Sequence, residues 1–178
     1  MTDRLQVFWD QRFSQHEPPP GAFSLPPAPG LAVNEPHPDR PERVVNIRSL
    51  LDAELGDHAS FVDVSPATEA AIERVHDPAY RERIAASSSD GGERLTPTTA
   101  TTPETYEVSR LAAGAAVGAT AAAVEGTDDV QYALVRPSGH HAQSAQADGF
   151  CFLNNAAIAA AHVLETTSTS SIAIFDWD

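Results

Sequence analysis

The order of segments over residues 130–178 places the strongest constraint on the fold. The run VQYALVR at 130–136 is apolar and β-branched, which is typical of a buried strand. A loop follows, then the alanine-rich segment NNAAIAAAHVLE at 154–165, which predicts a helix, and then SIAIFDWD at 171–178, which predicts a second strand. Strand, helix and strand in this order predict a crossover between two parallel strands. The chain is therefore expected to form an α/β domain with a mainly parallel sheet.

The rest of the chain alternates between strand and helix patterns in the same way. Short apolar runs at 5–10 and 61–64 predict two further strands. Other segments predict helices, at 40–55, 65–76, 77–88 and 102–125. The stretch SSSDGGERLTPTTATTPET at 87–105 has the composition of a loop, and we expect it to be flexible.

Two of the predicted helices carry more specific signals. In RPERVVNIRSLLDAEL, apolar residues recur at helical spacing and predict one buried face, made by Val44, Ile47, Leu50, Leu51 and Leu55. In SPATEAAIERVH, Ser65 is the expected N-cap residue and a proline occupies the next position. That helix is therefore predicted to begin near Ser65.

The charge balance restricts the partners of the protein. The chain has 25 acidic and 11 basic residues, a formal net charge of -14, and every basic residue is an arginine. Such a surface repels nucleic acid and anionic membranes, so neither is expected as a direct partner. The composition resembles that of halophilic proteins, with a GC-rich genome that replaces lysine by arginine as the alternative explanation.

Length and cysteine content restrict the organisation and the compartment. A chain of 178 residues is long enough to bury a sizeable core and is expected to form one domain. Cys151 is the only cysteine, which excludes an internal disulfide and favours a reducing cytoplasm. The N-terminus MTDRLQVFWDQRF is too charged for a signal peptide, and no apolar run reaches membrane-spanning length. We therefore expect a cytoplasmic protein.

Polar residues follow both strands of the predicted crossover. His140 and His141 lie in the loop after the first strand, and Asp176 and Asp178 end the second. Because ligands of open α/β sheets bind at the carboxyl ends of the strands, these side chains are expected at one rim. Two carboxylates on one side of a strand, beside two imidazoles, favour metal-assisted hydrolysis. The alternative is that the histidines are polar loop residues and the aspartates only end a strand.

The same residues, with two upstream motifs, resemble a known family. The strings that carry the resemblance are RPSGHHA (136–142), GFCFLNN (149–155), FDWD (175–178), HPDRPERV (37–44) and VHDPAYRERI (75–84). They resemble the zinc-dependent histone deacetylase family, class II-like, which includes acetylpolyamine amidohydrolases and acetoin-utilisation-type proteins. The resemblance implies a three-layer αβα arginase/deacetylase fold. Residues 1–178 would be the N-terminal portion of a single deacetylase domain.

The resemblance implies a catalytic role for three of these residues. His141 would be the general base and acid that activates a zinc-bound water for attack on an acetamide carbonyl. His140 would be its companion imidazole, held and kept cationic by Asp176. Asp178 would be a direct Zn²⁺ ligand, and a structural monovalent cation remains open as a second cofactor.

The resemblance also implies residues that shape the path of the substrate. Gly149 and Phe150 would line a narrow tunnel for an acetylated lysine or polyamine arm, with Cys151 packed behind the metal. Arg40 matches an arginine in the channel for departing acetate. The implied substrates are an acetylated protein lysine or an acetylpolyamine.

The chain departs from the family pattern in two places that bear on activity. Where the family often has an aspartate that holds the substrate backbone, this chain has Thr98, and Asp90 is a nearby alternative carboxylate. The chain stops at Asp178, inside a motif, so the remaining zinc ligands would lie beyond that residue. We therefore expect a domain truncated at its C-terminal end, and a 178-residue polypeptide that is inactive by itself.

Two other functions remain open at this point. One is a non-catalytic remnant that binds acetylated ligands or a protein partner through the surviving rim. The other is a metal-dependent phosphoesterase, because HH and DxD patterns also occur at two-metal phosphate sites. The apolar residues of GFCF argue against a phosphate and favour an acyl arm.

Overall fold

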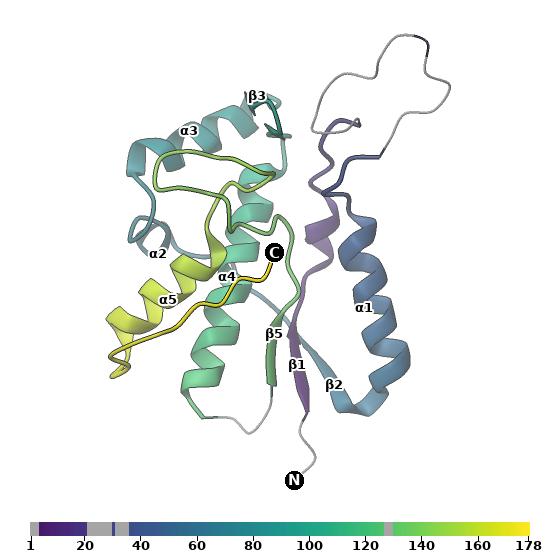
Figure 1. Cartoon of the computed structure of the whole chain (residues 1–178), viewed down its shortest axis with the longest axis vertical. Coiled ribbons are helices and arrows are strands. Elements are labelled where there is room, and N and C mark those ends of the chain that lie inside the picture. The colour runs from purple at the N-terminus through teal and green to yellow at the C-terminus, as the bar shows by residue number, and fades with distance from the viewer. Residues whose placement is uncertain (1–3, 21–29, 31–35, 127–129) are drawn as a thin grey trace.

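The computed structural model describes residues 4–20, 30, 36–126 and 130–178. Its centre is a parallel sheet in which β1 (Leu5–Phe8) lies between β2 (Ala59–Val62) and β5 (Val130–Ala133), as Figure 1 shows. These strands confirm the strand predictions for 5–10 and 130–136, and β2 begins two residues before the predicted 61–64. The expectation that the strand at 130–136 is buried is wrong, because Val130 and Tyr132 of β5 are 59% and 37% exposed at the edge of the sheet.

The three strands end at the same level. Phe8 is paired with Val62 on one side and with Ala133 on the other. Because the strands are parallel, their carboxyl ends form one edge, and the segments that leave this edge carry the candidate functional residues.

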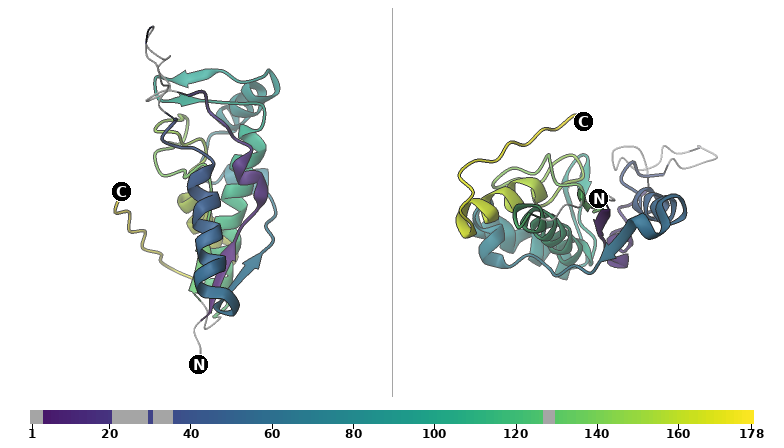
Figure 2. Two further views of the ribbon diagram at one scale, coloured as in Figure 1. Left: turned by 90° about the vertical axis from the view of Figure 1, so that its right-hand side faces the viewer. Right: turned by 90° about the horizontal axis from the view of Figure 1, so that it is seen from below.

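Helices cover both faces of this sheet. Helix α1 (Glu42–Leu55) lies on one side, and α4 (Thr105–Val124) lies on the other, with α5 (Asn155–Thr166) packed along α4 (Figure 2). Short 3₁₀ turns, η1 (Gln11–Ser14) and η3 (Gly56–His58), follow β1 and α1. The predicted three-layer α/β architecture is confirmed. Within the described residues, none of the helices has the length and apolar character that crossing a bilayer requires.

The core forms where α4 meets the sheet. Phe8 of β1 lies against Gly118 of α4, where a β-carbon would come within 3.0 Å of the phenyl ring. The residues of α4 that are buried in the same cluster as Val7 and Phe13 are Val108, Leu111, Ala112, Ala115 and Ala119. The small residues of α4 thus let the helix approach the sheet closely.

Helices α2 and α3 begin at residues whose side chains cap them. Helix α2 (Glu69–Ile72) begins after Thr68, whose hydroxyl accepts a hydrogen bond from the Ala71 amide at 3.2 Å. The predicted start near Ser65 is therefore wrong. The chain at Ser65 crosses α4 at Gly114, where a β-carbon would overlap the Ser65 carbonyl, and this crossing leaves no room for an earlier turn. Helix α3 (Pro78–Ser89) begins after Asp77, which accepts from the Ala79 amide at 2.8 Å.

The apolar face predicted for 40–55 is only partly buried. Val44 is buried and Leu51 packs against the core, whereas Ile47 is 40% exposed and Leu50 is 60% exposed. Helix α1 therefore contacts the sheet along a narrow strip.

The segment 87–105 contains regular structure where a loop was predicted. Strands β3 (Arg94–Thr96) and β4 (Thr99–Ala100) form an antiparallel hairpin. Thr101 closes its base, because its amide donates to the Glu93 carbonyl at 2.8 Å and its hydroxyl accepts from the Glu93 amide at 2.8 Å. The threonine-rich composition suggested a loop, but the Thr101 hydroxyl satisfies a backbone amide of the hairpin.

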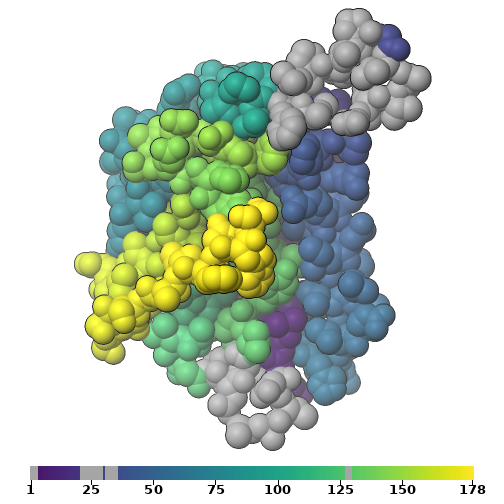
Figure 3. Space-filling model, in the orientation of Figure 1, coloured from purple at the N-terminus to yellow at the C-terminus, as the bar shows by residue number. Residues whose placement is uncertain are grey.

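The segment 171–178 forms no strand, so the predicted crossover is wrong in this structure. No ladder of hydrogen bonds joins it to β5 within the described residues. The segment runs across the outside of the domain, as Figures 2 and 3 show, and Ile174, Phe175 and Trp177 are 59%, 81% and 87% exposed. An apolar pattern favours a strand, but a strand also needs a partner for its backbone groups.

Candidate active site

The two adjacent histidines lie in the loop that follows β5. The ring centroids of His140 and His141 are 4.1 Å apart, with His140 half-buried and His141 exposed. The loop turns at Gly139, where φ is 101° and a β-carbon would overlap the Leu153 carbonyl. The Gly139 amide donates to the sulfur of Cys151 at 3.1 Å, so the buried cysteine supports the turn.

Both aspartates of the 171–178 segment lie beside His140. Oδ2 of Asp176 is 2.9 Å from His140 Nδ1, and Oδ2 of Asp178 is 3.4 Å from His140 Nε2. The Asp178 amide donates to Asp176 Oδ1 at 3.2 Å. This amide, followed by His140, lowers the pKa of the Asp176 carboxyl below its usual range. The structure thus brings His140, Asp176 and Asp178 together although the expected strand is absent.

These residues do not form a zinc site by themselves. Zinc sites use at least three protein ligands. In the part of the chain that the structure describes, no group of three His, Cys, Asp or Glu side chains could hold a metal ion. Asp178 contributes one exposed carboxylate at this place.

Gly149 lies over the ring of the exposed His141, and Phe150 follows it in the same turn. A β-carbon at Gly149 would overlap the His141 ring, and φ at Gly149 is 51°. Phe150 also has a positive φ, 67°, which costs a non-glycine residue about 1 kcal/mol. The Phe150 amide donates to the Thr99 hydroxyl at 3.1 Å, and its ring packs edge-on against His37 with centroids 4.7 Å apart. The hairpin therefore holds the turn against the histidine.

Thr98 lies beside a carboxylate from another segment. Its hydroxyl donates to Oδ1 of Asp148 at 3.3 Å, directly before Gly149. Asp90 is exposed at the end of α3. Asp148 was not singled out in the sequence, because no pattern links it to a threonine 50 residues away.

Arg40 lies at the surface, on the same side as His37. With Glu17, His37 and Glu42 it lines a pocket of about 310 Å³. This pocket is large enough for an acetate ion. The role of Arg40 in a channel for acetate stays a prediction.

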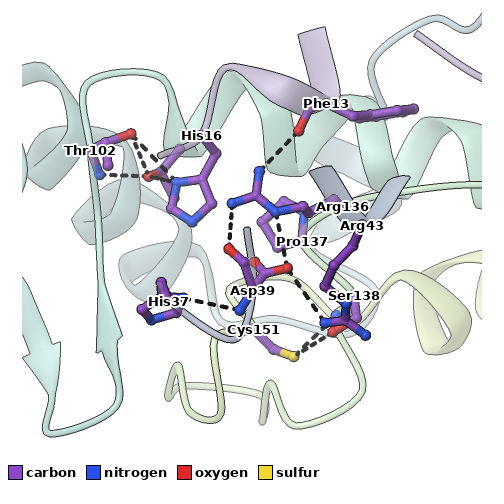
Figure 4. Close-up of polar contacts among 12 residues, drawn as sticks. Phe13, His16, His37, Asp39, Arg43, Thr102, Arg136, Pro137, Ser138 and Cys151 are labelled. Carbon is purple, nitrogen blue, oxygen red and sulfur yellow. Dashed lines mark hydrogen bonds and ion pairs between the residues drawn. The ribbon is translucent and has the colours of Figure 1, made fainter. Parts of the chain in front are cut away.

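Arg136, four residues before His140, forms a buried ion pair with Asp39 (Figure 4). Nε of Arg136 donates to Asp39 Oδ1 at 3.0 Å, and Nη2 donates to the Asp39 carbonyl at 2.7 Å. Nη1 donates to the Phe13 carbonyl at 3.0 Å. Burial raises the pKa of Asp39 and lowers that of Arg136, and the attraction between the two charges opposes both changes.

Two buried histidines lie next to this pair. His16 contacts the Thr105 hydroxyl through Nδ1 at 2.9 Å and packs edge-on against Phe152. Burial, followed by the charges of Arg136 and His37, lowers the pKa of His16 to about 3. Burial also lowers the pKa of His37, whose Nδ1 accepts from the Asp39 amide at 3.1 Å. Both imidazoles are therefore neutral near pH 7.

Sequence reasoning missed this network. Arg136 stands in the RPSGHHA string and Asp39 in HPDRPERV, so both motifs pointed to the region. The pairing joins residues that are 97 positions apart, which a single sequence does not reveal.

Comparison with known proteins identifies the family of the chain. A sequence model of the histone deacetylase domain matches residues 37–178. The chain belongs to the histone deacetylase family. Histone deacetylase 8 of Arabidopsis thaliana is 36% identical in an alignment of 182 positions that covers 100% of this chain and 48% of that protein. Polyamine deacetylase HDAC10 of Homo sapiens is 35% identical in an alignment of 147 positions that covers 79% of this chain and 22% of that protein.

The same relationship holds in three dimensions. The crystal structure of the HDA15 HD domain superimposes with a TM-score of 0.74 and 27% sequence identity, over 90% of this chain and 42% of that chain. The chain thus has the α/β fold of histone deacetylases. It spans about half the length, or less, of the relatives that it matches, 48% and 22% for the two above.

Proposed function

We propose that this chain supplies part of the active site of an amidohydrolase that removes acetyl groups from lysine side chains or from polyamines. The main support for this proposal is the contact of 2.9 Å between Nδ1 of His140 and Oδ2 of Asp176. The exposed ring of His141 lies directly beside His140. Family membership supports the reaction class, and the names of relatives include both a histone deacetylase and a polyamine deacetylase.

The proposed chemistry assigns the histidines different tasks. His141, with Gly149 packed on its ring, would accept a proton from the attacking water and return it to the leaving amine. His140 would be oriented by the Asp176 carboxylate, which fixes the position of its ring. Gly149 and Phe150 would line the path of the acetylated arm, and Arg40 would attract the acetate product.

Zn²⁺ is the proposed cofactor, because the resemblance implies it. When bound, it would polarise the acetamide carbonyl. Asp178 would be one ligand, but the described residues do not supply a group of three, so this chain does not complete the site by itself.

The test replaces His141 in the full-length gene product. His141→Ala is expected to reduce acetate release from an acetyl-lysine peptide and from acetylspermidine by about 100-fold or more, since general acid/base catalysis contributes that much. His58→Ala is the control, because His58 is exposed on η3. Full activity of His141→Ala, with unchanged circular dichroism, would exclude His141 as the base.

A second candidate function is binding without catalysis. The incomplete ligand set among the described residues favours it, and Phe175 and Trp177 offer apolar surface to a protein partner. This candidate predicts that the 178-residue chain binds an acetylated peptide but not its unacetylated form in isothermal titration calorimetry. Equal binding of both peptides, or of neither, would contradict it.

A further inference from the structure

Asp148 occupies a place at the candidate tunnel that the family pattern gives to another residue. The resemblance leads us to expect a substrate-holding aspartate at position 98, where this chain has threonine. The structure places a carboxylate there from a different segment, with Asp148 Oδ1 at 3.3 Å from the Thr98 hydroxyl. The next residue, Gly149, packs on the His141 ring. Asp148 is thus one residue away from the proposed path of the substrate.

The position of this carboxylate is fixed by its surroundings. The amide of Asp148 donates to the Cys151 carbonyl at 3.2 Å, and the Cys151 amide donates back at 2.8 Å, so the turn 148–151 is closed. Oδ1 accepts from the Gly149 amide at 2.8 Å as well as from Thr98. Both hydrogen bonds end on Oδ1, which leaves Oδ2 as an acceptor on a partly buried side chain.

The charge of Asp148 is not neutralised locally. Within the described residues, it takes part in no ion pair with an arginine or histidine. A partly buried carboxylate without a counter-ion attracts a cationic donor more strongly than a neutral N–H group. The net charge of -14 adds a long-range attraction for polycations.

We infer that Asp148 is a specificity-determining residue that binds a protonated amine of the substrate close to its acetamide. This inference rests on the proposed deacetylase function and narrows its substrates to acetamides that also carry a protonated amino group, the acetylpolyamine class. Oδ2 accepts the ammonium group, while Thr98 and the Gly149 amide hold Oδ1.

The experiment compares Asp148→Asn with the unchanged full-length gene product on two probes with flexible aliphatic arms. Monoacetylated spermidine carries protonated amino groups, and N-hexylacetamide carries none. Asparagine keeps an oxygen for Thr98 and Gly149 but removes the charge, so the turn is retained. We expect kcat/KM for acetylspermidine to fall about tenfold or more, with less than about a threefold change for N-hexylacetamide. An acetyl-lysine peptide tests whether a neutral backbone N–H of the substrate also binds Oδ2 of Asp148. If Asp148→Asn lowers kcat/KM for this peptide as much as for acetylspermidine, the inferred preference for a cation is overturned.

Two further variants separate specificity from a structural effect. Asp90→Asn removes an exposed carboxylate near the same hairpin and should change neither probe. Thr98→Asp, added to Asp148→Asn, should restore part of the preference for acetylspermidine. An equal loss on both probes, or no loss on either, overturns the role of Asp148.

Calorimetry separates this inference from the proposed function. Tighter binding of acetylspermidine than of N-hexylacetamide, lost in Asp148→Asn, supports the inference even if neither probe is hydrolysed. Hydrolysis with an unchanged preference in Asp148→Asn overturns the inference and leaves the deacetylase function intact. Neither binding nor hydrolysis by the unchanged protein overturns both.

Discussion

Gly149 packs against the imidazole of His141 so closely that a β-carbon at position 149 would overlap the ring. Gly149→Ala should therefore displace His141 and lower the deacetylation rate of the full-length gene product by about 100-fold, because small misplacements of a catalytic group are costly. Steady-state kinetics with an acetyl-lysine peptide measures this loss.

Gly56 provides the matched control for this prediction. Its φ of 47° is close to the 51° of Gly149, but no atom lies within 4 Å of its β-carbon position. Gly56→Ala should cost about 1–3 kcal/mol of stability from backbone strain, because its ψ of -122° lies outside the left-handed helical region, and should leave the rate unchanged. Equal rates for the two variants would show that contact with His141 is unimportant.

The buried ion pair between Arg136 and Asp39 is expected to contribute strongly to the free energy of unfolding of the protein. Arg136→Met would leave Asp39 as an uncompensated buried carboxylate and lower the free energy of unfolding by about 3–5 kcal/mol. Arg48→Met, which removes an exposed pair with Asp52, should cost less than about 1 kcal/mol. Urea unfolding monitored by circular dichroism compares them, and similar losses would contradict the prediction.

His16 is expected to make the protein less stable in acid. Its pKa is about 3 in the folded protein, against an ordinary 6.5. Between these values the unfolded chain binds a proton that the folded chain does not, so the free energy of unfolding falls as pH falls. The slope is at most about 1.4 kcal/mol per pH unit. This contribution is fully present above pH 6.5.

Urea unfolding at several pH values between 7.5 and 4.5 checks this prediction. His16→Gln cannot titrate, so its stability should depend less on pH than that of the unchanged protein. His58→Gln, at an exposed position, should leave the pH dependence as it was. If His16→Gln retains the full slope, the acid sensitivity comes from other groups.

The sequence predicted those parts of the fold that local patterns determine. The strands at 5–10 and 130–136 lie in apolar, β-branched runs, and Asp77 followed by proline is a strong helix start, so their local preferences agree with the final structure. The segment 171–178 has an equally clear strand pattern but forms none, because a strand depends on a partner that its own residues do not specify.

Contacts between distant segments account for the rest of the site. The motifs correctly brought His140 and Asp176 to one place, although the strand expected to carry Asp176 is absent. Neither the contact between Thr98 and Asp148 nor that between Asp39 and Arg136 could be predicted, since each depends on how whole elements pack. The threonines at 98, 99 and 101 suggested a loop because their hydroxyls favour turns. In the structure the Thr101 hydroxyl binds the Glu93 amide of the hairpin, and the hydroxyls of Thr98 and Thr99 bind the turn at 148–151.

The 178-residue chain alone is expected neither to bind Zn²⁺ tightly nor to release acetate. The described residues contain no group of three ligands, and one or two carboxylates at an exposed position do not replace the hydration shell of the ion. Calorimetric titration with zinc chloride, beside an acetate-release assay, tests this expectation, with Asp178→Ala as the comparison. Tight binding of one ion per chain would contradict it. Loss of that binding in Asp178→Ala would then identify Asp178 as a ligand. Its carboxylate lies 3.4 Å from Nε2 of His140.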